Sequence, residues 1–223
     1  MVIQSIKLLP ILCLTLVLCL SVGGAEKEPA KNSAAAKDAS SPWVSLFDGK
    51  SLNCWKANEN PQSCRVEEGA IVVNGDRSHL FYVGDVNDGD FKNFEFKCDV
   101  KTSPKANSGI YFHTKYQDSG WPVHGYESQV NNTSGDPKKT GGLYGVQDVY
   151  TAPVKDNEWF EYHIIVRGKR VIVKINGEAT ADYMEPDNLK QGSRRISSGT
   201  FALQAHDPGS KVLYKNLRVK VLP

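Results

Sequence analysis

The sequence predicts an all-β protein, either a sandwich or a barrel of antiparallel strands. From Trp43 onward, short segments alternate apolar and polar residues, and Gly, Asn, Asp or Pro bounds each of them. No amphipathic stretch in this part of the chain is long enough to predict a helix of more than about two turns. Neither an internal repeat nor a βαβ pattern is visible, so the sequence does not predict a solenoid or a parallel sheet.

The alternating segments are the expected strands. In chain order they are 69–73, 79–83, 91–101, 109–114, 126–131, 159–167, 170–176, 200–205 and 212–221. Gly168-Lys169 joins two of them as a hairpin, and Asn176-Gly177 is the strongest two-residue hairpin signal in the chain. Residues 115–125 form a long irregular connection between two expected strands, and a loop of this length in a compact domain is often functional.

The N-terminus has the order of a signal peptide. Lys7 precedes a mostly apolar run from Leu8 to Leu20, and a small-residue stretch ends at Ala25. We expect cleavage after residues 1–25, since the apolar run is short for a membrane span of about 20 residues. An uncleaved anchor is the alternative, and the bulky residue before Cys19 disfavours a lipoprotein signal. The expected location is therefore secreted or periplasmic, with no membrane span after cleavage.

Charge and composition exclude some functions and divide the rest of the chain into a linker and one domain. The 27 basic and 25 acidic side chains among 223 residues give a formal charge of +2, which offers no electrostatic footprint for nucleic acid. Residues 26–42 are rich in Ala, Lys and Ser without apolar periodicity, and they predict a flexible linker. A single folded domain is expected over residues 43–223.

Three cysteines lie outside the expected signal peptide. Cys98 alternates with apolar neighbours and is expected to be a buried core residue. Cys54 and Cys64 flank a polar loop, and in an oxidising compartment they would form a disulfide worth about 3 kcal/mol. Two free thiols are the alternative. The chain has no C-x-x-C, and its cysteines lack zinc-ligand spacing. We assign no metal ligands and no cofactor from the sequence.

The same alternation assigns polar and aromatic side chains to the face opposite the core on three expected strands. If Ile110 and Phe112 are core residues, for example, their neighbours in the strand point the other way. The side chains assigned in this way to the open face are Tyr111, His113, Glu127, Gln129, Gln204 and His206. They form one polar concave face if their strands are neighbours in one sheet.

Further polar and aromatic residues in nearby loops are expected at the rim of that face. They are Lys115, Tyr116, Trp121, His124 and Tyr144. Such a mixture suits a saccharide, because aromatic faces contact ring C–H groups while amides, acids and imidazoles bind hydroxyls. The alternative is an ordinary solvated face, since the outer face of an antiparallel sheet is polar by default.

The sequence lacks the motifs of several common enzyme classes. The chain has no G-x-S-x-G elbow, Walker loop, H-E-x-x-H or EF-hand loop. A conventional glycosidase needs two carboxylates, but Glu127 is the one convincing acid on the open face. Asp118, Asp148 and Asp207 are candidates in loops only.

Several blocks of the sequence resemble the 3-keto-disaccharide hydrolase domain family. They are WVSLFDGKSL at 43–52, NSGIYF at 107–112, WPVHGYE at 121–127, TGGLYG at 140–145 and LQAH at 203–206. The resemblance extends over residues 43–223. It implies a two-sheet antiparallel jelly-roll sandwich of the concanavalin-A-like lectin/glucanase type, with Glu127 and Gln129 on its concave face.

The resemblance also implies activity on 3-keto-glycosides, whose ketone acidifies the C2 proton. We expect Glu127 to remove that proton, so that the C1 substituent leaves by elimination and water then adds. His206, His113 or Lys115 would stabilise the enolate or protonate the leaving group. A bound metal in place of these donors is the alternative, and the sequence does not show one. Two positions depart from the family pattern: His113 stands where Arg is common, and Ala205 where Asp often precedes the matched His. A non-catalytic carbohydrate-binding module or a cell-surface interaction domain is the alternative.

Overall fold

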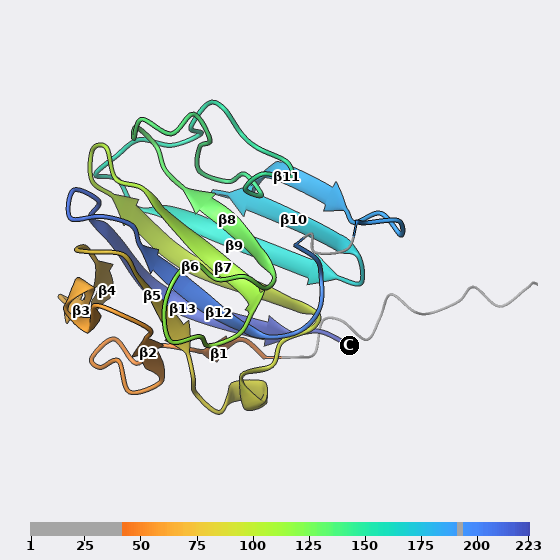
Figure 1. Cartoon of the computed structure of the whole chain (residues 1–223), viewed down its shortest axis with the longest axis horizontal. Helices are drawn as coiled ribbons and strands as arrows, with labels where there is room; N and C mark the ends of the chain where they lie inside the picture. Colours follow the sequence, from red (N-terminus) through yellow and green to blue (C-terminus); the bar gives the residue numbers. More distant parts are fainter. Residues whose placement is uncertain (1–41, 191–193) are drawn as a thin grey trace, which may run out of the picture. The chain divides into compact units, whose positions relative to one another are not determined.

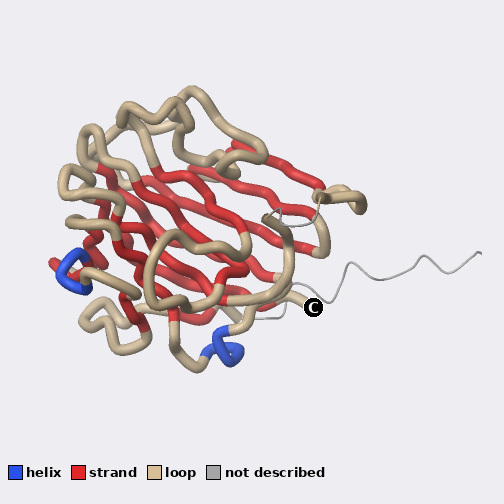
Figure 2. The backbone as a smooth tube through the Cα atoms, viewed as in Figure 1, coloured by secondary structure: helices blue, strands red, loops and turns tan. Residues whose placement is uncertain are grey.

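Two antiparallel β-sheets packed face to face make up the described part of the protein (Figure 1). The structure is a computed structural model that describes residues 42–190 and 194–223; the expected signal peptide and nearly all of the expected linker lie outside these residues. Its helices are short 3₁₀ turns, η1 (Pro61–Ser63) and η2 (Val86–Gly89), and strands and loops form the rest (Figure 2). No helix within the described ranges is long and apolar enough to cross a membrane. The prediction of an all-β sandwich is confirmed.

One sheet has eight strands in the order β11-β10-β9-β6-β13-β4-β3, with β1 also paired to β13. Their bounds are β1 Val44–Ser45, β3 Cys64–Glu67, β4 Ala70–Val73, β6 Phe94–Thr102, β9 Phe160–Arg167, β10 Arg170–Ile175, β11 Glu178–Met184 and β13 Val212–Val221. The expected hairpin is present, because β9 and β10 pair across Gly168-Lys169.

The second sheet has five strands in the order β2-β5-β12-β7-β8. Their bounds are β2 Trp55–Ala57, β5 Ser78–Tyr82, β7 Ser108–Thr114, β8 Tyr126–Val130 and β12 Thr200–Ala205. All the expected strands are present. The sequence missed β1, β2 and β3, which are too short for alternation to be visible, and β11, which is largely exposed. Residues 74–77, which connect β4 to β5, cross from one sheet to the other, because these two strands belong to different sheets.

The core fills the space between the two sheets. In β6 every second side chain is buried, including Phe94 and Phe96, and the residues between them face outward. Phe201 of β12 packs against both rings, with centroids 4.9 and 4.7 Å away. Burial of each such side chain stabilises the fold by about 1.5–3 kcal/mol. Cys98 is fully buried among them, as predicted.

The predicted disulfide is wrong. Cys54 is a free, exposed thiol, and Cys64 is a free, buried one. Cys54 precedes β2 in the five-stranded sheet, whereas Cys64 begins β3 in the eight-stranded sheet, so the polar loop between them passes from one sheet to the other. Burial raises the pKa of the Cys64 thiol to about 11. The thiol therefore stays protonated and acts as a small apolar side chain.

Candidate functional site

The outer face of the five-stranded sheet brings together side chains from three strands. Tyr111 of β7 lies opposite Glu127 of β8, and Gly109 lies opposite Gln129. β12 pairs with the other edge of β7 and carries Gln204. Side chains on paired strands with the same orientation lie about 5–8 Å apart, so these residues form one surface.

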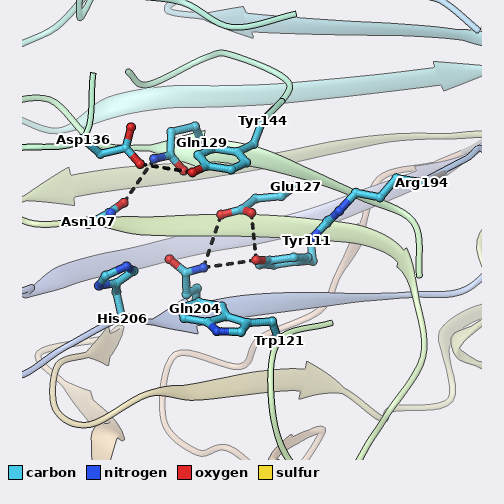
Figure 3. A pocket seen from close by; sticks show the side chains of 10 residues that line it. All are labelled: Asn107, Tyr111, Trp121, Glu127, Gln129, Asp136, Tyr144, Arg194, Gln204 and His206. Carbon is cyan, nitrogen blue, oxygen red and sulfur yellow. Dashed lines mark hydrogen bonds between the residues drawn. The ribbon is translucent and has the colours of Figure 1, made fainter. Parts of the chain in front are cut away.

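These side chains line a pocket of about 250 Å³ (Figure 3). The lining residues are Asn107, Tyr111, Trp121, Glu127, Gln129, Asp136, Tyr144, Arg194, Gln204 and His206. Glu127, Gln129 and Gln204 are only 6%, 1% and 2% exposed. This part of the sheet is therefore not an ordinary solvated face.

The Glu127 carboxylate is held at both oxygens. The Tyr111 hydroxyl donates to Oε2 at 2.8 Å, and the Gln204 amide donates to Oε1 at 3.2 Å (Figure 3). The same Gln204 nitrogen lies 3.2 Å from the Tyr111 hydroxyl and donates to it. Gly109 leaves room for the carboxylate, because a Cβ at this position would lie 2.4 Å from Oε1.

Burial raises the pKa of Glu127 above its ordinary value. The hydrogen bonds from Tyr111 and Gln204 and the positive charges of Arg194 and His206 oppose this rise without cancelling it. Burial also raises the pKa of the Tyr111 hydroxyl, which remains a neutral donor. A positioned carboxyl with a raised pKa suits proton transfer near neutral pH.

A second carboxylate lies on another side of the pocket. The Tyr144 hydroxyl donates to Oδ2 of Asp136 at 3.3 Å. Lys138 Nζ lies 3.9 Å from the centroid of the Tyr144 ring and 3.4 Å from the Asp148 carboxylate. Gln129 donates to Asn107 Oδ1 at 3.1 Å, so this wall is also ordered by side-chain contacts.

Trp121 contributes an aromatic wall from the 115–125 loop. Its ring lies 5.3 Å from the buried His79 ring and 5.5 Å from the His206 ring. Hydrogen bonds at Gly120, in which its N–H donates to Glu59 and its carbonyl accepts from Asn58, anchor the loop to the segment that follows β2. The long irregular loop therefore contributes to the site, as its length suggested.

His206 follows β12 and is fixed by its neighbour. Its Nδ1 lies 2.7 Å from Asp207 Oδ2, and Asp207 also accepts hydrogen bonds from Ser210 and from the Gly209 N–H. With Nδ1–H held by Asp207, a protonated imidazole can release the proton on Nε2 and take one up again, which suits the ring to proton transfer. Among the described residues, no three His, Cys, Asp or Glu side chains are arranged to hold a metal ion.

The family model of the 3-keto-alpha-glucoside-1,2-lyase-like domain matches residues 42–220. The chain belongs to this family. A candidate glycosyl hydrolase from Parabacteroides distasonis ATCC 8503 is 25% identical, with a TM-score of 0.69 over 81% of this chain and 94% of that chain. A second from the same strain is 22% identical, with a TM-score of 0.62 over 81% and 100%.

The carbohydrate-binding module CBM66 from Bacillus subtilis shares the fold at 13% identity, with a TM-score of 0.56 over 80% of this chain and 99% of that one. No curated protein matches the chain. Membership of the lyase-like family, together with the glycosyl hydrolase likeness, indicates a carbohydrate-related function.

The prediction that His113 lies on the open face of the sheet is wrong. β7 has one residue more than β12 between the pairs Tyr111–Ala202 and Thr114–Thr200, which is a β-bulge. His113 has a φ of 56°, so the alternation fails and its ring is buried against Phe94. The ring bonds to the backbone of Lys92 and Ser197 instead of facing the pocket.

Lys115, Tyr116 and His124 do not line the pocket either. Lys115 and His124 are exposed, and Lys115 and Tyr116 lie in a separate hollow beside Thr114. β7 ends at Thr114, so its alternation does not extend to Lys115.

The other expected site residues line one pocket. They are Tyr111, Trp121, Glu127, Gln129, Tyr144, Gln204 and His206. Sequence reasoning missed Asp136 and Arg194, which lie in irregular segments without a pattern. Asn107 could have been predicted as a site residue, because it begins the block at 107–112 that resembles the family.

Proposed function

We propose that the protein cleaves 3-keto-glycosides by elimination, with Glu127 as the base. The observation that carries this proposal is the Glu127 carboxyl itself, which is buried in the wall of an open pocket, bonded at both oxygens and shifted to a raised pKa. Elimination next to a ketone requires one well-placed base, and this carboxyl has the properties of one. Membership of the lyase-like family supports the same chemistry.

The reaction balances with the side chains present. Glu127 takes the C2 proton, and the C2–H electrons move into the bond towards the C3 ketone, so that the ketone oxygen becomes an enolate. When the electrons return, the C1–C2 double bond forms, the C1–O bond breaks and the leaving oxygen takes a proton. The products are an unsaturated 3-keto sugar and a free alcohol, and later addition of water across the double bond makes the net reaction a hydrolysis.

His206 is the proposed donor of the proton to the leaving oxygen. It lines the same pocket as Glu127, and Asp207 fixes its ring. Gln129 and Tyr144 would bind sugar hydroxyls, and Trp121 would contact the C–H face of a ring. The pocket of about 250 Å³ is slightly smaller than the range of about 300–1,000 Å³ for drug-sized ligands, so we expect it to hold one sugar ring.

The test is turnover of an aryl 3-keto-glucoside by the purified protein, followed by release of the aryl alcohol. Glu127→Gln should lower kcat by about 10²- to 10⁴-fold, because it removes the base. Glu178→Gln, on the exposed edge strand β11, is the matched control and should behave as wild type. Turnover by Glu127→Gln at the wild-type rate would rule out the role of this residue.

The matching unoxidised glucoside is the substrate control. Asp136 gives the pocket a second carboxylate, which conventional glycoside hydrolysis requires. Elimination predicts turnover of the keto-glucoside alone. Turnover of both compounds would favour conventional hydrolysis, and saccharide binding without turnover of either would identify a carbohydrate-binding module.

We also propose that the protein is exported. The support is the sequence of residues 1–25, which lie outside the described part of the chain. Mass spectrometry of the protein from the producing cells should find a mature chain that begins at Glu26. A cytoplasmic chain that retains Met1 would contradict this.

A further inference from the structure

Arg194 enters the pocket from the segment that leads into β12. Its guanidinium carbon lies 5.5 Å from the centroid of the Tyr111 ring, on the ring face (Figure 3). Nη2 donates to the Pro122 carbonyl at 3.4 Å, in the loop that carries Trp121. Nη1 is buried and has no hydrogen-bond partner among the described residues.

Arg194 differs from two other basic residues near the pocket, which are paired with carboxylates. Lys138 is paired with Asp148, and Arg77 with Glu59, at 3.4 and 2.9 Å. Arg194 forms no ion pair with any residue of 42–190 or 194–223. A guanidinium stays charged at every relevant pH, and a buried N–H without a partner is costly. A ligand oxygen would satisfy it.

The other donors next to Glu127 are already engaged. The Tyr111 hydroxyl donates to the carboxylate, and the Gln204 amide nitrogen bonds to both. His206 bonds to Asp207 through Nδ1, and its Nε2 is the proposed proton donor to the leaving oxygen. Of the described residues that line the pocket, Arg194 therefore supplies the one buried donor without a partner.

We propose that Arg194 is a further catalytic residue, whose Nη1 binds the C3 oxygen of a 3-keto-glycoside and stabilises the enolate. The assignment rests on the proposed function. Glu127 and Arg194 both contact Tyr111, one at its hydroxyl and the other over its ring. A base and a cation on one wall can reach C2 and the C3 oxygen, because these belong to neighbouring carbons of the sugar. The charge that moves to the oxygen during proton removal then meets a fixed positive donor.

The variants that test this are Arg194→Met, which removes the charge, and Arg194→Lys, which keeps it. Arg195→Gln is the matched control, because Arg195 is exposed and donates to the Lys190 carbonyl. Two rates are measured on a 3-keto-glycoside in D₂O: release of the alcohol, and uptake of deuterium at C2 of the remaining substrate. The second rate reports enolate formation alone.

Arg194→Met should lower both rates by about 10²- to 10³-fold, more than it raises KM. Arg194→Lys should recover part of the loss, and Arg195→Gln should match wild type. A role limited to holding Pro122 predicts instead a raised KM, an unchanged kcat and no recovery by Lys. Either an unchanged kcat in Arg194→Met or failure of Lys to improve on Met would overturn the proposal.

The pH profile gives a separate readout. The charged or titratable groups of the pocket that interact with the Glu127 carboxyl are Tyr111, Tyr144, Arg194 and His206, and the charges of the last two lower its pKa. The acid limb of kcat/KM should therefore move to higher pH in Arg194→Met and stay in place in Arg194→Lys. An acid limb at the wild-type position in Arg194→Met would contradict direct contact between this charge and the reacting groups.

Binding separates the two proposals. If the wild type binds 3-keto-glucose in a calorimeter but does not turn over keto-glycosides, elimination is wrong. Weaker binding by Arg194→Met would then still support its contact with the C3 oxygen, and equal binding would overturn it. Absence of binding by the wild type would overturn both.

Discussion

The two sheets present outer faces of opposite character. On the five-stranded sheet, Glu127, Gln129 and Gln204 are almost completely buried and bond to other side chains of the pocket. On the eight-stranded sheet, Lys97 of β6 and Glu161 of β9 form an ion pair of 3.0 Å that remains partly exposed to solvent. The first face has ordered polar groups around an opening, and the second is a solvated surface.

The strands themselves do not produce this difference. Outward positions are polar in β6 as they are in β8. What differs is the cover over the first face, where irregular segments supply Trp121, Asp136, Tyr144 and Arg194. Polar residues on a strand become a candidate site when loops from elsewhere exclude water from them and leave an opening.

Among the effects that test this comparison of the two faces, the largest is expected from closing the space under the Glu127 carboxylate. In Gly109→Ala the new Cβ would lie 2.4 Å from Oε1, so the carboxylate must move. Displacement of a catalytic group by about 1 Å can cost about 10²-fold in rate, and we expect a loss of at least this size on a 3-keto-glycoside. Gly135→Ala is the control, because its Cβ meets open space. Equal turnover by both variants would show that the carboxylate position does not matter.

The second effect is a pH dependence of the free energy of unfolding, caused by a buried histidine on the covered face of the five-stranded sheet. His79 is fully buried, both ring nitrogens lack partners, and burial lowers its pKa to about 3. In the unfolded chain the imidazole takes up a proton near pH 6.5, so the unfolded state binds more protons between pH 6.5 and 3. Stability is therefore lost as the pH falls through this window. Between pH 7 and 5, His79 should lower the free energy of unfolding by about 2 kcal/mol.

Urea unfolding of His79→Phe at both pH values measures this contribution. Phe keeps the edge-on packing against Tyr111 and Trp121 but cannot take up a proton. The loss of stability between pH 7 and 5 should shrink in this variant and stay at the wild-type value in His124→Gln, an exposed control. The same loss in all three proteins would contradict a buried neutral His79.

A smaller effect is expected on the open face of the eight-stranded sheet. The coupling energy between Lys97 and Glu161, measured by a double-mutant cycle with Ala, should be only about 0.2–1 kcal/mol and should decrease in salt. Turnover should not change, because neither residue lines the pocket. A coupling energy of several kcal/mol would mean that this face is also shielded from water.

The smallest effect is expected from reduction of the protein. Cys54 and Cys64 belong to segments of different sheets and are not bonded to each other, so a reducing agent should leave Tm unchanged. A bridge would be worth about 3 kcal/mol, which reduction would remove as a clear fall in Tm. Among the cysteines of residues 43–223, a thiol reagent should titrate Cys54 rapidly and the buried Cys64 and Cys98 only on unfolding.

Most of the site could be predicted where alternation holds. Glu127, Gln129 and Gln204 lie on regular strands, so parity alone gave their face correctly. The prediction for His113 was wrong because β7 has a β-bulge there, and its one extra residue breaks the alternation of side chains. Asp136 and Arg194 could not be predicted, because an irregular segment carries no period and its path depends on distant contacts such as Arg194 to Pro122.

The sequence by itself determined the strands with visible alternation, their buried face outside the bulge of β7, and the family to which the chain belongs. These follow from local patterns, because the side chains of a strand alternate whatever lies beside it. Tertiary structure alone decided the order of the strands, the separation of Cys54 from Cys64, the burial of His113 and the cover over Glu127. Each of these depends on contacts between residues far apart in the chain, and no local period encodes such contacts.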